Sequence, residues 1–344
     1  MTAVRINLKD GNQLGHGPED FVQDTGGAYP RLLVSCTRRR PKREGEPGSY
    51  GGIWEVRLDN HAVRELPVVH DKPEEFFQPH GIDLVTVDGQ RKLYVISHTL
   101  VPVKGKDPRS VQQVRIYRVE QDRLEQEGAS LESDEYLRSP NDIAALPDGS
   151  FYFTNDASTH EQIKSGLLHV LHLPTANVIR WKNGEGFSEA KDGFVFANGI
   201  AYTGERLLVT DVMSRSLHVY RIREGGKLEK EKKIGAAEKG LDNISLVNAN
   251  TALVPAHTSI LKFVAYSKRQ ISATPADDDN KHSPFSVFMF DLANGTSKTI
   301  CEHDGTQIDA VSSAIIYNNK LYLAQIFEPY LLAVDLDASG MAQL

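Results

Sequence analysis

The chain has 344 residues, of which 40% are hydrophobic and 25% are charged, and its formal net charge is −7. This composition is that of an ordinary globular protein and excludes a long disordered chain or a coiled coil. It offers no basic face for nucleic acid, and no run of about 18 apolar residues predicts a membrane-spanning helix. The first residues lack the apolar core of a secretory signal, so we expect a cytoplasmic or otherwise soluble protein.

Six segments of the chain resemble one another, and they begin at Glu19, His80, Asn141, Asn198, Asp242 and Ser312. Each opens with a pair of small or polar residues, runs through a short apolar strand and a turn, and continues as a second alternating strand. Asp88-Gly89 and Asp148-Gly149 supply the positive φ angles that a tight turn requires. Each segment is therefore predicted to form a β-hairpin.

A third amphipathic strand follows each hairpin, and most third strands are followed by a weaker outer strand. The predicted third strands are IWEVRLD from Ile53, VRIYRVE from Val114, LLHVLHL from Leu167, LHVYRIR from Leu217, SVFMFDL from Ser286 and LLAVDLD from Leu331. NVIRW at residues 177–181 is expected to be the outer strand of the third repeat. Six repeats of four strands predict an all-β, six-bladed β-propeller that forms a single domain over residues 1–344. Two stacked sandwiches are the alternative, but a sandwich gives no reason for six repeats.

The two ends of the chain complement each other. The sixth repeat has no outer strand after its third strand, whereas the alternating residues Val4–Leu8 precede the first repeat. We expect this N-terminal strand to pair with the sixth blade and close the ring.

The innermost strands of a propeller line its central tunnel, so the first residues of all six repeats should converge there. These residues are Glu19-Asp20, His80-Gly81, Asn141-Asp142, Asn198-Gly199, Asp242-Asn243 and Ser312-Ser313. Converging carboxylates would be destabilised by repulsion and desolvation unless a cation compensated them. Carboxylate and amide oxygens without thiolates suit a hard cation, and calcium fits such a set best. The pattern therefore predicts calcium on the axis.

Two histidines accompany this predicted ion. His80 opens the second repeat, and His98 ends the second strand of the same blade. A pair of neighbouring imidazoles can supply a base near neutral pH. His257, at the matching end of the fifth blade, could face the same pocket.

The cationic run RRRPKR at Arg38 to Arg43 is the densest charge cluster of the chain, and it is flanked by glycine and proline. We interpret it as a solvated loop; the alternative is a rim that attracts an anionic substrate or surface, for which the sequence shows no second basic cluster. Cys36 and Cys301, the only cysteines, are expected to be free thiols rather than a disulfide.

Four motifs occur in order along the chain: PHGI at Pro79, PNDI at Pro140 leading to FYFTND, FANGI at Phe196 and DNIS at Asp242. With them, the sequence from Glu19 to about Leu323 resembles the serum paraoxonase/arylesterase family of calcium-dependent lactonases, which are six-bladed propellers, and more distantly the gluconolactonase-type proteins. The resemblance implies a catalytic calcium and a second, structural calcium.

The resemblance also assigns roles to individual residues. The catalytic calcium would be held by Glu19, Asn141, Asn198, Asp242 and Asn243, and the structural calcium by Asp20, Asp142 and the backbone carbonyl of Ile82. The family's histidine dyad falls on His80 and His98, and Phe196, Asp156 and His257 match positions that line or support the pocket. The attacking group would be a water activated by the dyad or, in a different assignment, the carboxylate of Asp242.

The sequence departs from the family pattern in several places. It lacks the N-terminal hydrophobic helix and the disulfide of the secreted members, and the segments Arg38–Tyr50 and Thr99–Ser110 do not match. These two segments should shape the pocket entrance, which leaves the substrate open. We therefore expect a calcium-dependent hydrolase of small lactones or aryl esters, with no nucleic-acid partner and no membrane anchor in this chain. The alternative is a calcium-stabilised propeller with a non-hydrolytic binding or biosynthetic role.

Overall fold

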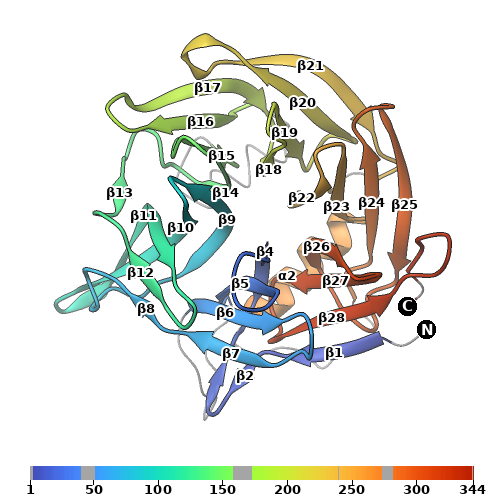
Figure 1. Ribbon diagram of the computed structural model, residues 1–344, viewed down its shortest axis with the longest axis horizontal. Helices are drawn as coiled ribbons and strands as arrows, with labels where there is room; N and C mark the ends of the chain where they lie inside the picture. Colours follow the sequence, from blue (N-terminus) through green and yellow to red (C-terminus); the bar gives the residue numbers. More distant parts are fainter. Residues whose placement is uncertain (1–2, 40–50, 158–172, 239, 273–281, 343) are drawn as a thin grey trace.

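The computed structural model describes residues 3–39, 51–157, 173–238, 240–272, 282–342 and 344. Most of these residues lie in small antiparallel sheets arranged radially around one axis (Figure 1). In each of the six blades one strand lies nearest the axis, and the strands that pair with it in succession lie progressively farther out. The expected six-bladed β-propeller is thus confirmed, whereas its description as one domain over 1–344 stays a prediction.

The blades follow one another in chain order. The first contains β4 (Pro18–Asp24), β5 (Arg31–Thr37), β6 (Gly51–Arg57) and β7 (Val63–Leu66). The second contains β9 (Pro79–Val87), β10 (Gln90–Val103), β11 (Lys106–Val119) and β12 (Leu124–Gln126), with the short strands β8 (Val68–Val69) and β13 (Leu131–Glu132) added. The third contains β14 (Pro140–Ala145), β15 (Phe151–Asn155), β16 (Ala176–Lys182) and β17 (Gly186–Phe194).

The other three blades complete the circle. The fourth contains β18 (Ala197–Tyr202), β19 (Arg206–Asp211), β20 (Ser216–Ile222) and β21 (Leu228–Gly235). The fifth contains β22 (Ser245–Asn248), β23 (Thr251–His257), β24 (Phe285–Asp291) and β25 (Thr296–His303). The sixth contains β26 (Val311–Tyr317), β27 (Lys320–Gln325), β28 (Tyr330–Asp335) and β1 (Ala3–Asn7). In the six blades the strand nearest the axis is β4, β9, β14, β18, β22 or β26. Outside the blades lie the hairpin β2 (Lys9–Asp10) and β3 (Gln13–Leu14), a 3₁₀ turn at Glu224–Gly226, and helix α2 (Ile260–Ile271).

The N-terminal strand closes the ring. Strand β1 pairs antiparallel with β28 from Ala3 opposite Val334 to Asn7 opposite Tyr330. Ile6 is buried in a cluster that joins the first and sixth blades. The predicted closure is therefore confirmed, and it covers an edge of β28 that would otherwise expose unpaired backbone groups.

Hydrophobic clusters fill the spaces between neighbouring blades. Leu33 and Ile53 of the first blade, for example, pack with Leu93 and Tyr117 of the second. Because successive side chains of a strand point to opposite faces, each blade can contact both of its neighbours. Burying apolar surface in this way contributes about 25 cal/mol per Å² and holds the six blades in a fixed circle around the tunnel.

The third blade differs from the sequence-based expectation. Residues 177–181, predicted as its outer strand, belong to the third strand β16, which pairs with β15 from Phe151 opposite Trp181 to Asn155 opposite Asn177. The outer strand is β17. That prediction was wrong because β16 is buried between two strands, with Trp181 stacked on Phe151, and so shows no outer-edge polarity. Most of the predicted third strand from Leu167 lies outside the described residues.

Two further features were not anticipated. The segment from Thr99 to Ser110 is not an irregular loop, because its residues extend β10 and β11 as a paired hairpin to Val103 opposite Lys106. Helix α2 begins after Ser259, whose side chain accepts a hydrogen bond from the backbone N–H of Lys262 at 3.4 Å. Its buried residue, Tyr266, packs on Ala310 and Phe327 beside the sixth blade.

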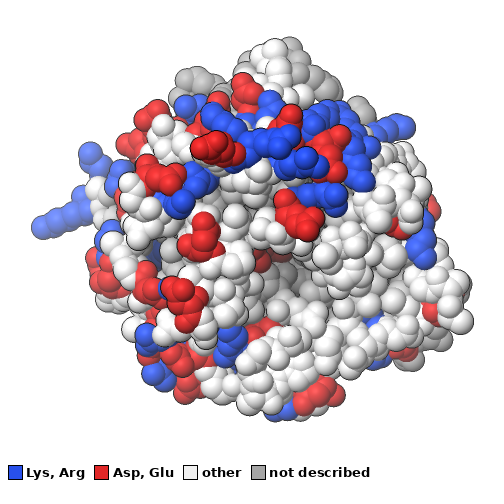
Figure 2. All heavy atoms as spheres, turned by 45° about the horizontal axis from the view of Figure 1, so that its top comes forward, with Lys and Arg blue, Asp and Glu red and all other residues white. Residues whose placement is uncertain are grey.

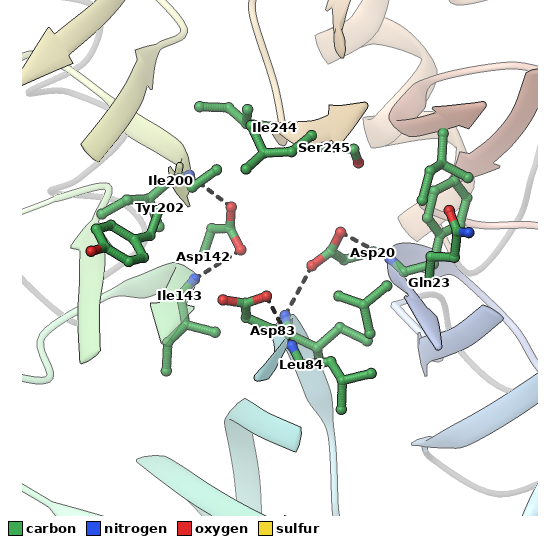
Figure 3. Close-up of a pocket in the computed structure, with 16 residues that line it drawn as sticks. Asp20, Gln23, Asp83, Leu84, Asp142, Ile143, Ile200, Tyr202, Ile244 and Ser245 are labelled. Carbon is green, nitrogen blue, oxygen red and sulfur yellow. Dashed lines mark hydrogen bonds between the residues drawn. The ribbon is translucent and has the colours of Figure 1, made fainter. Parts of the chain in front are cut away.

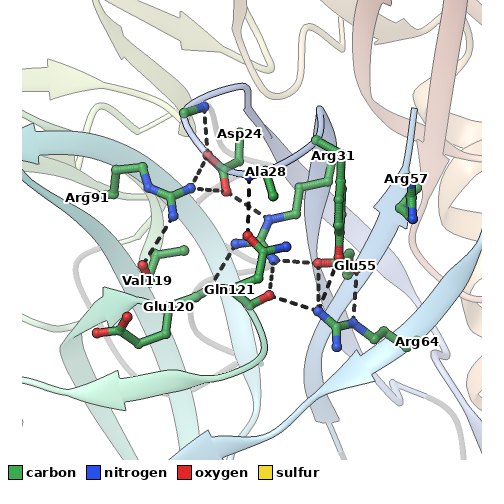
Figure 4. Close-up of polar contacts among 12 residues, drawn as sticks. Asp24, Ala28, Arg31, Glu55, Arg57, Arg64, Arg91, Val119, Glu120 and Gln121 are labelled. Atoms are coloured by element: carbon green, nitrogen blue, oxygen red, sulfur yellow. Dashed lines mark hydrogen bonds and ion pairs between the residues drawn. The ribbon is translucent and has the colours of Figure 1, made fainter. Parts of the chain in front are cut away.

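Buried ion pairs tie the first blade to the second (Figure 4). The fully buried Arg31 guanidinium contacts Asp24, with Nε 2.8 Å from Oδ2, and Glu55, and it donates to the backbone carbonyl of Gln121 at 2.9 Å. Arg91, at the start of the second blade's second strand, pairs with Asp24 at 2.6 Å. The interface between the first and second blades is therefore held in part by charge-assisted hydrogen bonds.

The outer edge of the molecule is highly charged but mixed in sign. Figure 2 shows basic and acidic side chains intermixed in a band across the upper part of the view. Strand β21, with the sequence LEKEKKIG, contributes both signs at the outer edge of the fourth blade. Charged outer strands hinder edge-to-edge pairing between molecules. None of the described helices combines the length and apolar character needed to cross a membrane.

Candidate metal centre and active-site cavity

The opening residues of the repeats meet at the axis, and glycine makes this close approach possible. A Cβ at Gly81 would lie 2.5 Å from the backbone carbonyl oxygen of Asn141, and one at Gly199 would lie 2.5 Å from that of Asp242. Such distances are well inside van der Waals contact, so a side chain here would push neighbouring blades apart. The glycines of the second and fourth repeats thus let the third and fifth repeats bring their side chains to the axis.

Hydroxyl groups fix the backbone at these openings. Thr37 donates to the carbonyl of Pro79 at 2.6 Å, Thr154 donates to that of Asn198 at 2.5 Å, and Thr210 donates to that of Asp242 at 2.8 Å. In each case a second-strand residue of one blade holds the opening of the next. Side chains carried by such a restrained backbone keep a well-defined position.

Five predicted calcium ligands are buried oxygen donors at the openings of their repeats, and each is at most 8% exposed: Glu19, Asn141, Asn198, Asp242 and Asn243. The Oε2 atom of Glu19 and the Oδ1 atoms of the three asparagines have no hydrogen-bond partner among the described residues. A buried acceptor without a partner costs about 1–3 kcal/mol. These four acceptors come from four different blades, and their chemistry fits the oxygen ligands that a hard cation takes.

The electrostatics of the set agree with this fit. The pKa of Glu19 is raised to about 8, chiefly by burial, with a smaller increase from the charges of Asp20 and Asp242 and an opposing effect of Arg39. Among the described residues, no group of three or more His, Cys, Asp and Glu side chains is placed to hold a metal. The present set has two carboxylates and three asparagine amides, so any ion here would depend on amide oxygens.

The two predicted histidines are neighbours at the mouth of the tunnel. The ring centroids of His80 and His98 are 4.8 Å apart, in an edge-to-face arrangement. Arg39 donates to Nδ1 of His80 at 2.6 Å, and His98 donates through Nδ1 to the side-chain oxygen of Gln112. Burial lowers the pKa of His80 well below its ordinary value and that of His98 to about 4, so both rings are neutral at neutral pH. Arg39 and Gln112 are therefore the groups that orient the pair, and neither was anticipated from the sequence.

His257 lies beside the axis, although not with the other two histidines. Its Nε2 donates to Oδ2 of Asp242 at 3.0 Å, and its ring stacks on Phe263 of helix α2 with centroids 3.9 Å apart. The residue is 3% exposed. Helix α2 therefore supports a histidine that fixes the orientation of the Asp242 carboxylate.

The residues predicted for a second ion meet further along the tunnel. Asp20, Asp142 and Ile82 line a cavity of about 200 Å³, together with Asp83, which the sequence reasoning missed. Figure 3 shows the carboxylates of Asp20, Asp83 and Asp142 around this space. No lysine or arginine is among the described residues that line it. Burial raises the pKa of Asp20 to about 7 and that of Asp83 to about 6, and it raises that of Asp142 well above its ordinary value.

These three carboxylates also connect the blades directly. Asp20 accepts a hydrogen bond from the backbone N–H of Ile82 at 2.9 Å, and Asp142 accepts one from Ile200 at 2.8 Å. Asp83 accepts from Ala145 at 2.8 Å. Each bond links the innermost strand of one blade to that of the next, so this ring has a structural role independent of any metal.

A larger cavity, of about 680 Å³, opens above the oxygen set. His80, His98, Asn141 and Asp156 are among its lining residues, and Asp156 accepts a hydrogen bond from Ser139. Phe196 is half-buried two residues before Asn198 and is not among the described residues that line the cavity. The extended hairpin contributes Leu100, Ser110 and Gln112 to the wall, so it shapes the entrance.

Three arginines also line this cavity: Arg38, Arg39 and Arg138. Arg38 is 7% exposed, and Arg39 lies with Nη2 3.7 Å from Oε2 of Glu19. The interpretation of the cationic run as a solvated loop is therefore wrong for its first two residues, while residues 40–43 lie outside the described part of the chain. The two cysteines, Cys36 and Cys301, are buried and free, as expected.

Comparisons with known proteins agree with this architecture. Serum paraoxonase/arylesterase 2 of Bos taurus is 25% identical over 320 residues, which cover 90% of this chain and 84% of that protein. Serum paraoxonase/arylesterase 1 of Rattus norvegicus is 24% identical over 291 residues, which cover 82% of this chain and 76% of that protein.

Solved structures share the fold at lower identity. A gluconolactonase of Xanthomonas campestris matches with a TM-score of 0.56 and 15% identity over 97% of this chain and 89% of its own. A luciferin-regenerating enzyme matches with a TM-score of 0.56 and 10% identity over the whole of both chains. The sequence model of one family, Arylesterase, matches residues 46–332. Because that match covers most of the chain, this protein belongs to the arylesterase family.

Proposed function

We propose that this protein is a calcium-dependent hydrolase of lactones or related esters whose reaction takes place where the cavity meets the oxygen set. Family membership supports hydrolysis of esters at the level of the family. The observation that carries the calcium is the group of buried oxygens on Glu19, Asn141, Asn198 and Asn243 that have no hydrogen-bond partner among the described residues. A calcium ion held there would stabilise the negative charge that develops on the carbonyl oxygen of the substrate.

The protein's own residues would provide the remaining chemistry. His80 Nδ1 lies 3.4 Å from Oε2 of Glu19, which places this nitrogen at the border between the cavity and the oxygen set. As a neutral imidazole it can accept a proton from an attacking water, provided that Arg39 yields its hydrogen bond to this nitrogen. His98, anchored by Gln112, would support the ring of His80 from its far side.

The carboxylate of Asp242 is the alternative group that could attack the substrate carbonyl, because its orientation is also fixed. The hydrogen bond from His257 fixes one carboxylate oxygen of Asp242, as a nucleophile would require. Single-turnover hydrolysis in ¹⁸O-labelled water distinguishes the two mechanisms. Label that enters the product directly supports the histidine base, whereas label that first enters the Asp242 carboxylate supports the acyl intermediate.

The function itself is tested with a panel of γ-lactones, δ-lactones and phenyl acetate, assayed with calcium and with a chelator. We expect turnover of at least one member with calcium and its loss with chelator, while circular dichroism monitors the fold. An absence of calcium-dependent turnover across the panel would favour a non-hydrolytic binding or biosynthetic role for the same propeller.

A further inference from the structure

The arginines in the mouth of the cavity suggest a preference among possible substrates. Arg38 and Arg39 follow the second strand of the first blade, and Arg138 precedes the first strand of the third. Two separate segments thus bring guanidinium groups to one cavity. Asp156, the one acidic residue among the described lining residues, already accepts a hydrogen bond from Ser139.

The guanidinium groups of Arg39 and Arg138 differ in how many of their nitrogens already make contacts within the protein. Arg39 is fixed by His80 and by the backbone carbonyls of Gly17 and Ile326, each 3.4 Å from its Nη1. Arg138 is half-buried, and its Nε donates to the carbonyl of Glu135 at 2.8 Å. That bond holds the base of the guanidinium and leaves its terminal nitrogens available for a ligand.

We infer that this cavity selects lactones or esters that carry an anionic group, such as a carboxylate, close to the reacting ring; the inference rests on the proposed hydrolytic function. The reacting carbonyl would point toward Asn141 and the oxygen set, while the anion would contact Arg138 and the arginines of the first blade. Guanidinium groups bind carboxylates through charge-assisted, often paired hydrogen bonds. In a partly buried cavity this attraction is screened less than on the surface.

The test compares two substrates of similar size: 5-oxotetrahydrofuran-2-carboxylate and its carboxamide. We expect kcat/KM for the carboxylate to exceed that for the carboxamide by about tenfold or more at low salt, and to approach it as sodium chloride is raised. Arg138→Gln should reduce the ratio of the two values. Arg123→Gln, which alters an exposed ion pair with Glu125, is the matched control and should leave the ratio unchanged.

A binding measurement separates this inference from the proposed function. Tetrahydrofuran-2-carboxylate and tetrahydrofuran-2-carboxamide contain no lactone, so titration calorimetry measures their affinities without turnover. Selective binding of the carboxylate, weakened by Arg138→Gln, supports the anion site even if no lactone is hydrolysed, in which case only the proposed function fails. Equal kcat/KM values with equal affinities overturn the inference and leave hydrolysis intact. A carboxylate preference that Arg138→Gln does not change also overturns it, because the anion would then be bound by something other than this cavity mouth.

Discussion

At the scale of single residues, the metal centre depends on groups that are costly to bury. Glu19 and Asp20 are adjacent on β4, and their pKa values are raised to about 8 and about 7. At pH 7 the metal-free protein should therefore hold protons on these carboxylates that a bound cation would displace. The chemistry of the site links calcium affinity to pH.

Calcium binding is thus expected to release protons near pH 7 and to strengthen as pH rises toward 8. The reason is that Glu19 must lose its proton before it can bind a cation. Calorimetric titration in buffers with different ionisation enthalpies measures the number of protons released. A binding enthalpy that does not vary among buffers, with an affinity that is constant between pH 6 and 8, would contradict this prediction.

The role of His80 makes a second prediction. His80→Gln should lower kcat for lactones by about 10²-fold or more, because the glutamine cannot accept the proton of the attacking water. Calcium affinity, measured by calorimetry, should change little, since His80 is not one of the proposed ligands. His61→Gln, on the outer part of the first blade near Tyr322, is a matched histidine control and should retain normal turnover. Normal turnover in His80→Gln would exclude His80 as the base.

The sequence predicted a residue's place at the axis where that residue occupies an equivalent position in several repeats. Glu19, Asn141, Asn198 and Asp242 occupy equivalent repeat positions, so the propeller itself predicts that they meet. Arg39, Arg138 and Asp83 were missed for a physical reason. Their places at the tunnel depend on how loops and neighbouring blades pack, and a run of arginines between polar residues has the composition of a solvated loop.

At the scale of elements, the N-terminal strand contributes apolar burial as well as backbone pairing. Ile6 is 3% exposed and contacts the cluster between the first and sixth blades, whereas Val4 on the same strand is 38% exposed. Ile6→Ala should destabilise the protein by about 2–5 kcal/mol in denaturant unfolding, and Val4→Ala by much less. Deletion of residues 1–10 should lower the melting temperature further, because β28 would lose its partner. An unchanged melting temperature after the deletion would refute the closing role of β1.

The ion pairs between the first two blades make a separate prediction. Arg31→Met should cost about 3–5 kcal/mol in unfolding free energy, because it leaves Asp24 and Glu55 buried with fewer partners. Arg118→Met removes a surface pair with Glu125 and should cost far less than Arg31→Met, because water and salt screen an exposed pair. Chemical denaturation of both variants provides the comparison. A similar small loss in both would mean that Arg91, which pairs with Asp24, and Arg64, whose Nε lies 3.0 Å from Oε1 of Glu55, compensate fully for Arg31.

Element boundaries were less predictable than element order. The hairpins and the closing strand were predicted correctly, because alternating apolar residues and turn residues mark them in the sequence. The residues of β16 were predicted to form the fourth strand of the third blade, but they form its third strand. Because β16 is buried between β15 and β17, its sequence does not show the polarity that would mark an outer strand. Helix α2 shows an N-cap serine at Ser259 followed by Phe263 and Tyr266 at helical spacing, a pattern that could have revealed it.

At the scale of the whole molecule, the free energy of unfolding should depend on pH and on calcium, because both act on the buried carboxylates of the tunnel. The raised pKa values of Glu19 and Asp20 mean that the folded, metal-free protein binds more protons than the unfolded chain between about pH 6.5 and about pH 8. Below about pH 6.5 the lowered pKa values of His80 and His98 act in the opposite direction, because these histidines would be protonated in the unfolded chain. Stability should therefore decrease as pH rises from about pH 6.5 to about pH 8. Calcium should reduce or reverse that decrease, because it binds the ionised carboxylates of the folded state. Melting curves recorded from about pH 6.5 to about pH 8 with calcium and with chelator measure both slopes; parallel slopes would contradict the coupling.

The central claim is that hydrolysis depends on calcium held by oxygens from several blades. The most direct measurement is the turnover of a γ-lactone by metal-depleted protein during titration with calcium, with calcium binding followed by calorimetry in the same buffer. We expect no turnover before calcium is added and a rise in rate that follows occupancy of the site, while Asn198→Ala shifts both curves to higher calcium. Undiminished turnover by metal-depleted, folded protein would contradict the account.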